Sequence, residues 1–142
     1  MQKPEPNPNA DSQPYWDACG REELIYQSCE HCGNSQFYPR ARCVRCGSAK
    51  LRWLKSAGRG VVYAVTEVHT GQPGFEEDAP YFIALVELDE GFRIMTNIVG
   101  GRDGIVIGRR GRIVFETRGA YKLPQFLAEK KCPGSRPAKH YP

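Results

Sequence analysis

Two Cys-x-x-Cys-Gly turns, with ten residues between Cys32 and Cys43, constrain this chain more than any other feature. Two residues between the cysteines of a pair let one tight turn direct both sulfur atoms to the same point, and the glycine that follows adopts positive φ without strain. Four thiolates in two such turns close a tetrahedral site with Zn–S bonds of about 2.3 Å. The sequence therefore predicts a structural zinc site whose ligands are Cys29, Cys32, Cys43 and Cys46.

The same cysteine pattern has two alternatives to zinc. Iron in the same sulfur cage is the main chemical competitor. Two disulfides would need a secreted domain, but residues 1–6 have no apolar stretch like that of a signal peptide. Because four cysteines complete the coordination, His31 in the first turn is expected to be an exposed loop residue. The two remaining cysteines are expected to be free thiols, Cys19 buried and Cys132 exposed.

The net charge of +4 is unevenly placed along the 142 residues. Residues 1–120 carry 15 Lys and Arg against 15 Asp and Glu, so the excess lies in residues 121–142. A nucleic-acid-binding protein normally carries a basic excess over its folded body, and this neutral body argues against that class. No apolar run approaches the ~20 residues of a membrane helix, which leads us to expect a soluble, cytoplasmic protein.

The chain divides by composition into five segments. Residues 1–13 are rich in Pro, Asn and Gln and are expected to form a disordered leader. Residues 14–26 are expected to hold a short N-terminal helix, and residues 27–53 the zinc ribbon. Residues 54–126 are expected to form a barrel, and residues 127–142 a basic tail.

The barrel segment shows the period-two alternation that is typical of strands. One long β-branched run is followed by a hairpin, whose turn is Asp89-Glu90-Gly91. This order favours a mainly β fold with a small five-stranded OB-type barrel after the helix and the ribbon. The expected strands are 60–69, 80–88, 92–99, 112–116 and 121–126.

No catalytic constellation stands out in the sequence. There is no Gly-x-Ser-x-Gly elbow, no phosphate loop and no His-Glu-x-x-His, so we do not expect an autonomous enzyme. Basic residues gather over the ribbon and its junction with the barrel, among them Arg40, Arg42 and Arg59. Such a patch suits phosphates, either of a nucleic acid or of the nucleotide end of coenzyme A.

Further motifs occur in a fixed order between residues 14 and 126. Besides the two cysteine turns they are Phe37-Tyr38-Pro39-Arg40, Trp53, Gly58-Arg59-Gly60, Pro80-Tyr81, Val86-Glu87-Leu88-Asp89-Glu90-Gly91, Gly108 and Leu123-Pro124-Gln125-Phe126. Together they resemble the rubredoxin-like zinc ribbon plus OB-fold family known as domain of unknown function 35. The combined order is far more specific than any single motif.

The resemblance implies a small non-catalytic subunit of an acyl-CoA enzyme complex. Its implied partner is a thiolase-fold catalytic subunit, of a thiolase, a steroid side-chain aldolase or an acyltransferase, which it would stabilise while helping to bind the acyl-CoA. The four cysteines carry over as zinc ligands, and no catalytic residue carries over. Arg40, Arg42 and Arg59 are then expected to face the coenzyme A phosphates. The alternatives are a zinc-ribbon and OB nucleic-acid-binding module and a stand-alone acyl-CoA-binding protein.

Overall fold

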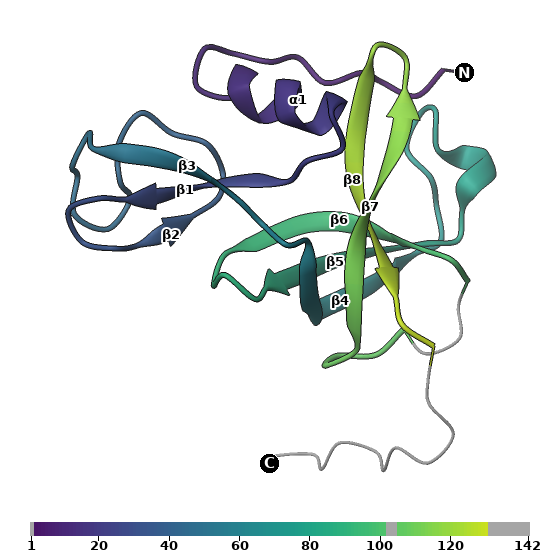
Figure 1. Cartoon of the computed structure of the whole chain (residues 1–142). Coiled ribbons are helices and arrows are strands. Elements are labelled where there is room, and N and C mark those ends of the chain that lie inside the picture. Colours follow the sequence, from purple (N-terminus) through teal and green to yellow (C-terminus); the bar gives the residue numbers. More distant parts are fainter. Residues whose placement is uncertain (1, 102–104, 131–142) are drawn as a thin grey trace.

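The computed structural model describes residues 2–101 and 105–130. It contains one α-helix, a three-stranded sheet and a closed five-stranded barrel (Figure 1), which confirms the predicted mainly β fold class. Within these two ranges, no helix is long and apolar enough to cross a membrane. The elements are α1 (Gln13–Gly20), β1 (Ile25–Cys29), β2 (Ser35–Gln36), β3 (Leu51–Lys55), β4 (Arg59–Val68), η1 (Glu76–Asp78), β5 (Tyr81–Leu88), β6 (Arg93–Val99), β7 (Arg110–Arg118) and β8 (Tyr121–Ala128).

The barrel strands follow one another in the order β4-β5-β6-β8-β7. Strands β4, β5 and β6 form an antiparallel meander, and β7 and β8 form an antiparallel hairpin. The barrel closes where β7 pairs with β4 and where β8 runs parallel to β6. Alternate side chains point inward, so the period-two pattern becomes an apolar core that buries Val62, Val86, Ile94 and Phe126.

Two glycines let the strands approach closely where the barrel closes. Gly60 of β4 pairs with Gly111 of β7. A Cβ atom at Gly111 would collide with the Phe126 ring and the Leu127 carbonyl oxygen, and one at Gly60 with the Glu87 carbonyl oxygen. These positions therefore require glycine for space, because a neighbouring backbone occupies the volume that a side chain would need.

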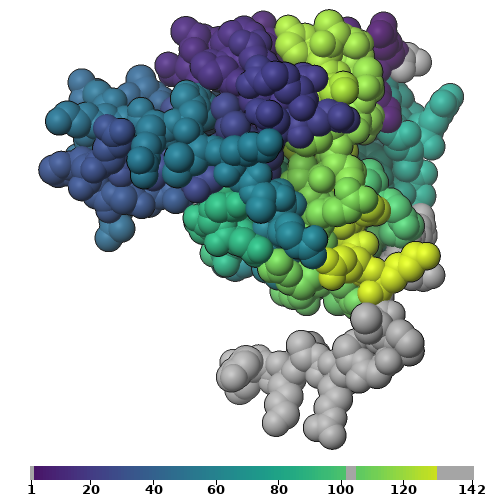
Figure 2. Space-filling view, viewed as in Figure 1, coloured from purple at the N-terminus to yellow at the C-terminus, as the bar shows by residue number. Residues whose placement is uncertain are grey.

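The ribbon and the helix share one apolar cluster with the barrel. Tyr26 of β1, the central ribbon strand, stacks on Phe92 of the barrel with ring centroids 4.5 Å apart and an interplanar angle of 16°. Trp16 of α1 meets Tyr121 of β8 edge to face at 6.2 Å. The space-filling view shows the three parts in contact (Figure 2). Because these contacts are buried or half-buried, the ribbon is held in a defined orientation against the barrel.

The connection between ribbon and barrel is tied to the β5–β6 turn by one carboxylate. Glu90 accepts hydrogen bonds from the Ser56 hydroxyl at 2.8 Å and from the Ala57 N–H at 2.7 Å. The Ser56 oxygen in turn accepts from the Gly58 N–H at 2.9 Å. Ser56 is buried, so this network satisfies polar groups that water reaches poorly.

The N-terminal segment differs from the disordered leader that its composition suggests. The Lys3 ammonium pairs with Asp78 and lies 5.5 Å from the centre of the Phe75 ring. Nearer the helix, the Asn9 side chain accepts from the Ser12 N–H, and the Ser12 hydroxyl accepts from the Asn9 N–H. The partners of Lys3 lie in a distant loop of the barrel, so local composition carries no sign of them.

The boundaries of the helix and of the last strand also differ from expectation. The helix ends at Gly20 instead of residue 26, because the chain turns there and enters β1 at Ile25. Strand β8 runs on to Ala128, two residues past the expected end of the barrel. Most of the predicted basic tail, residues 131–142, lies outside the described residues.

A substitution at Gly111 tests the close approach of the strands. Gly111→Ala is expected to lower the free energy of unfolding by about 1–3 kcal/mol, because the added methyl group forces Phe126 or the backbone to move. Gly20→Ala is the matched control, since a Cβ atom there meets nothing within 4 Å. Urea unfolding of the metal-loaded proteins measures both values. Equal midpoints for the two variants would contradict the prediction.

Candidate metal centre

The two cysteine turns have the same local hydrogen bonding. In the first, the Gly33 N–H donates to the Cys29 carbonyl oxygen at 2.9 Å, and in the second, the Gly47 N–H donates to the Cys43 carbonyl oxygen at the same distance. Both glycines adopt positive φ, 75° and 77°. Glycine enters this region at little cost, which explains its place after the second cysteine of each pair.

The four sulfur atoms converge on one point. The Sγ atoms of Cys29, Cys32, Cys43 and Cys46 all lie within 4.8 Å of one another. The Cys29–Cys46 and Cys32–Cys43 pairs are each 3.6 Å apart. A tetrahedron with Zn–S bonds of 2.3 Å has sulfur–sulfur edges of about 3.8 Å. The residues therefore fit a four-coordinate metal ion, bridging β1, the loop after it and the second turn.

Backbone N–H groups point at the sulfur atoms from both turns. The Cys32 N–H lies 3.5 Å from the Cys29 sulfur, and the Arg45 N–H lies 3.4 Å from the Cys43 sulfur. Hydrogen bonds from the Cys46 and Arg45 N–H groups lower the pKa of the Cys43 thiol to about 6 in the absence of metal. The Cys32 N–H likewise lowers the pKa of Cys29. These two sulfurs are prepared to bind as thiolates.

Four thiols this close cannot all ionise without a cation. The pKa of Cys46 is raised to about 12 even though a backbone hydrogen bond from Ser48 acts to lower it. Burial and hydrogen bonds to the other three sulfurs keep its proton in place. A divalent ion at the centre removes this conflict, because it offsets the negative charge that the thiolates accumulate.

A buried glutamine pair next to the centre holds the loop between the two turns. Gln36 of β2 donates to Gln27 of β1 at 2.9 Å, and Gln27 both accepts from the Arg40 N–H and donates to the Arg40 carbonyl oxygen at 2.9 Å. The Gln36 side chain also accepts from the Val44 N–H at 2.9 Å. Sequence reasoning missed these residues, although Gln27 stands two positions before Cys29 and so shares its face of the strand.

His31, Cys19 and Cys132 are the cysteine and histidine residues predicted to lie outside the ligand group. His31 is exposed and does not belong to the ligand group. Cys19 is a fully buried free thiol, and burial raises its pKa to about 11, which makes it a poor nucleophile. The prediction for Cys132 lies outside the described residues.

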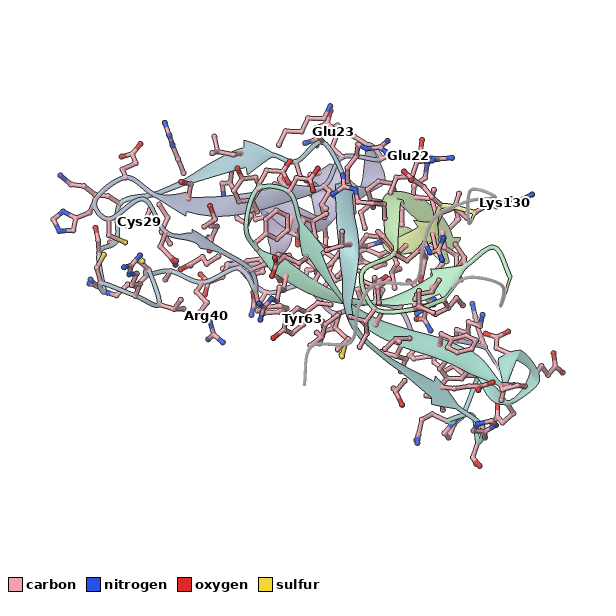
Figure 3. The ribbon with its side chains drawn as sticks, turned by 90° about the horizontal axis from the view of Figure 1, so that it is seen from below. Glu22, Glu23, Cys29, Arg40, Tyr63 and Lys130 are labelled. Atoms are coloured by element: carbon pink, nitrogen blue, oxygen red, sulfur yellow. The ribbon has the colours of Figure 1, made fainter. Side chains whose placement is uncertain are left out.

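The three arginines proposed for phosphates fall in two places. Arg40 and Arg42 are exposed on the ribbon, and the Arg42 guanidinium donates to the Gly47 carbonyl oxygen at 3.0 Å. Arg59 begins β4 on the barrel and pairs with Glu129 at 2.6 Å. No contact among the described residues joins Arg59 to the other two. Figure 3 shows the sulfur of Cys29 at the far end of the ribbon and Arg40 nearer the barrel.

A four-cysteine ribbon joined to a closed five-stranded barrel defines a class of zinc-ribbon and OB-fold proteins. Family models bear this out in both parts of the chain. Residues 16–52 match "ChsH2, rubredoxin-like zinc ribbon domain", and residues 53–116 match "ChsH2, C-terminal OB-fold domain". The chain belongs to the DUF35 family.

Several relatives carry informative names. A "DUF35 domain-containing scaffold protein" of Methanocaldococcus jannaschii is 37% identical over 65% of this chain and 67% of its own length. A "Probable enoyl-CoA hydratase alpha subunit" of Thermomonospora curvata is 38% identical over 75% of this chain, which spans only 33% of that protein. The "Benzoylsuccinyl-CoA thiolase subunit BbsA" of Geobacter metallireducens is 31% identical over 53% of this chain and 49% of its own length.

Solved structures agree with this assignment. A chain of the "Ltp2-ChsH2(DUF35) aldolase" superposes with a TM-score of 0.78 at 34% identity, covering 87% of this chain and 98% of that chain. A DUF35 protein of unknown function from Sulfolobus solfataricus superposes with a TM-score of 0.64 at 14% identity, covering 85% of this chain and 87% of that one. The second likeness shows the fold alone.

Replacing one ligand tests the metal centre. Cys46→Ser is expected to remove stoichiometric metal, because three sulfurs remain for a four-coordinate site. The Cys46 residue is exposed, so the change costs little packing. Elemental analysis of the purified proteins should give one zinc per wild-type chain. Cys19→Ala is the matched control and should retain the metal; retention of a full equivalent by Cys46→Ser would contradict the assignment.

Proton release tests the electrostatics of the four thiols. At pH 7 the raised pKa of Cys46 keeps it protonated without metal, so zinc binding should release at least one proton per ion. Calorimetric titration in buffers of different ionisation enthalpy measures that number. As the pH falls through about 6, Cys43 also takes up a proton, so the zinc affinity should fall with decreasing pH. A buffer-independent enthalpy would contradict this account.

Proposed function

We propose that the protein is a non-catalytic accessory subunit of a thiolase-fold acyl-CoA enzyme, a thiolase or a retro-aldolase. The observation that carries this proposal is the likeness to a chain of the "Ltp2-ChsH2(DUF35) aldolase", which extends over 98% of that chain at 34% identity. The relatives named as scaffold proteins and as a thiolase subunit support the same role. In this role the chain stabilises its partner and helps to bind the substrate.

The chemistry of the described residues supports a non-catalytic role. The clear pKa shifts among them belong to the metal-site cysteines, to the buried groups Tyr15, Cys19 and Tyr26, and to exposed ion pairs such as Asp89 with Arg110. None of these pairs a nucleophile with a general base in a cleft. The catalytic groups are therefore proposed to belong to the partner.

Zinc is the metal we propose for the four-sulfur site, with a structural task. Four cysteines leave no open coordination position for a substrate, unlike the three-ligand sites of zinc enzymes. The ion holds β1 to the second turn and so orders a module of few buried residues. That order extends to the barrel through the stacking of Tyr26 on Phe92.

For the acyl-CoA we propose a site shared with the partner. The clefts described on this chain, of about 310 and 280 Å³, are at or below the small end of the ~300–1,000 Å³ range of ligand pockets. Arg40 and Arg42 are exposed on the ribbon and available to the phosphates of coenzyme A. A phosphate at Arg59 would have to compete with Glu129.

Co-purification followed by reconstitution tests the proposed function. The tagged chain, produced in its native host, is expected to bring down a thiolase-fold protein that mass spectrometry identifies. When that protein is produced separately, adding the metal-loaded chain should raise its activity on an acyl-CoA about tenfold or more and raise its melting temperature. The Cys46→Ser variant should raise the partner's activity and melting temperature less than the wild type does, since its ribbon lacks the metal. Purification of the chain alone, with no effect on any thiolase-fold protein, would contradict the proposal.

Binding measurements on the isolated chain separate the alternatives. Tight binding of coenzyme A without a partner would favour a stand-alone acyl-CoA-binding protein. Steeply salt-dependent binding of single strands would favour a nucleic-acid module. The proposed function predicts neither, and predicts coenzyme A affinity only in the reconstituted complex.

A further inference from the structure

The outer side of β4, β5 and β6 carries exposed apolar side chains where a solvated sheet face is usually polar. Leu85 of β5 pairs directly with Met95 of β6, and Met95 is 74% exposed. Tyr63, at the bulge of β4, is also exposed. The Arg93 guanidinium lies over the Tyr63 ring at 3.6 Å from its centre. These four residues, which we call the sheet face, form one surface across three strands.

A cleft of about 310 Å³ joins the sheet face to the ribbon. Its lining includes Glu87 and Arg93 from the barrel and Val44 from the second cysteine turn. Val44 is an apolar side chain that is 63% exposed. Figure 3 shows Arg40 of the ribbon and Tyr63 of the barrel projecting from the same side of the molecule. The sheet face, the cleft and the second turn therefore make one indented surface.

The ribbon edge of this surface has unbalanced positive charge. Arg45 follows Val44, which lines the cleft, and both Arg40 and Arg45 are exposed; no ion pair among the described residues involves either of them. By contrast, Arg59, Arg93 and Arg110 on the barrel each pair with a carboxylate. An apolar centre beside unpaired arginines is complementary to an apolar patch that carries acidic residues at one edge.

We propose that this indented surface docks the catalytic subunit, through an apolar patch on that subunit with carboxylates facing Arg45 at the ribbon edge. The inference rests on the proposed function, which supplies the partner. Apolar side chains such as Met95 and Leu85 lose their contact with water on docking, and residues at the centre of an interface contribute most of the affinity. The arginines set orientation and association rate.

A second copy of the chain and a nucleic acid fit the surface less well. A second copy in a two-fold dimer would present the same surface, and the one carboxylate that lines its cleft, Glu87, already pairs with Arg93, so it offers no acidic edge to Arg45. Single-stranded nucleic acid stacks on exposed aromatic rings, but the centre here is aliphatic, and Arg93 already covers the ring of Tyr63. A protein partner with acidic residues at its edge is the occupant that both the shape and the charge favour.

Binding of matched variants tests the docking surface. The probe is the separately produced thiolase-fold protein identified by co-purification, with no coenzyme A present. Met95→Glu should weaken binding about tenfold or more, because it places a carboxylate at the centre of the interface. Gln13→Glu introduces the same residue at an exposed position of α1 and should bind like the wild type. Arg45→Glu should weaken binding and reduce its salt dependence. Arg21 pairs with Glu23, which Figure 3 shows on the side opposite Tyr63 and Arg40, so Arg21→Glu should change neither.

Independent measurements keep the outcomes distinct. Metal content and circular dichroism establish that each variant is folded, and hydrogen exchange of the wild-type complex should show protection of β5 and β6. Equal affinity of all variants without such protection would overturn the docking surface and leave the proposed function standing. Absence of binding by the wild type would overturn both. Self-association or nucleic-acid binding that Met95→Glu abolishes would overturn the choice of occupant.

Discussion

The convergence of four sulfur atoms on one point is the constraint on which the ribbon depends. The module has only short strands and few fully buried side chains, so it gains little from apolar burial alone. Its two turns donate backbone N–H groups to the sulfurs and lower the pKa of Cys29 and Cys43, but Cys46 keeps its proton until a cation arrives. A metal ion bound by these four sulfurs would therefore couple its own binding to the folding of the ribbon.

The ordered ribbon contacts the barrel through aromatic packing. With β1 in place, Tyr26 stacks on Phe92 and the ribbon becomes part of the same apolar cluster as the barrel interior. Glu90 ties down the connection between the two parts. A rigid joint of this kind suits a subunit whose surface must fit a partner, because a preformed interface loses less conformational entropy on binding.

Local patterns were predictable where neighbouring residues decide the structure. The spacing of the cysteines implied that Cys29 and Cys43 would approach in space, and the period-two alternation implied the strands that form the barrel. The fold class and the order of its parts followed from these patterns together with the family resemblance. The contacts of Lys3 and the buried Gln27 network were not predictable, because their partners lie elsewhere in the chain.

The sequence by itself determined the group of four cysteines, the mainly β class and the order of helix, ribbon and barrel, since each depends on local spacing or periodicity. Only the tertiary structure decided which residues share a surface. In the tertiary structure Arg59 pairs with Glu129 on the barrel, whereas Arg40 lies on the ribbon. Val44 of the ribbon lines the same cleft as Arg93 of β6, the strand that also carries Met95. The physical reason is that surfaces are assembled by strand register and by packing between distant segments, which no local pattern encodes.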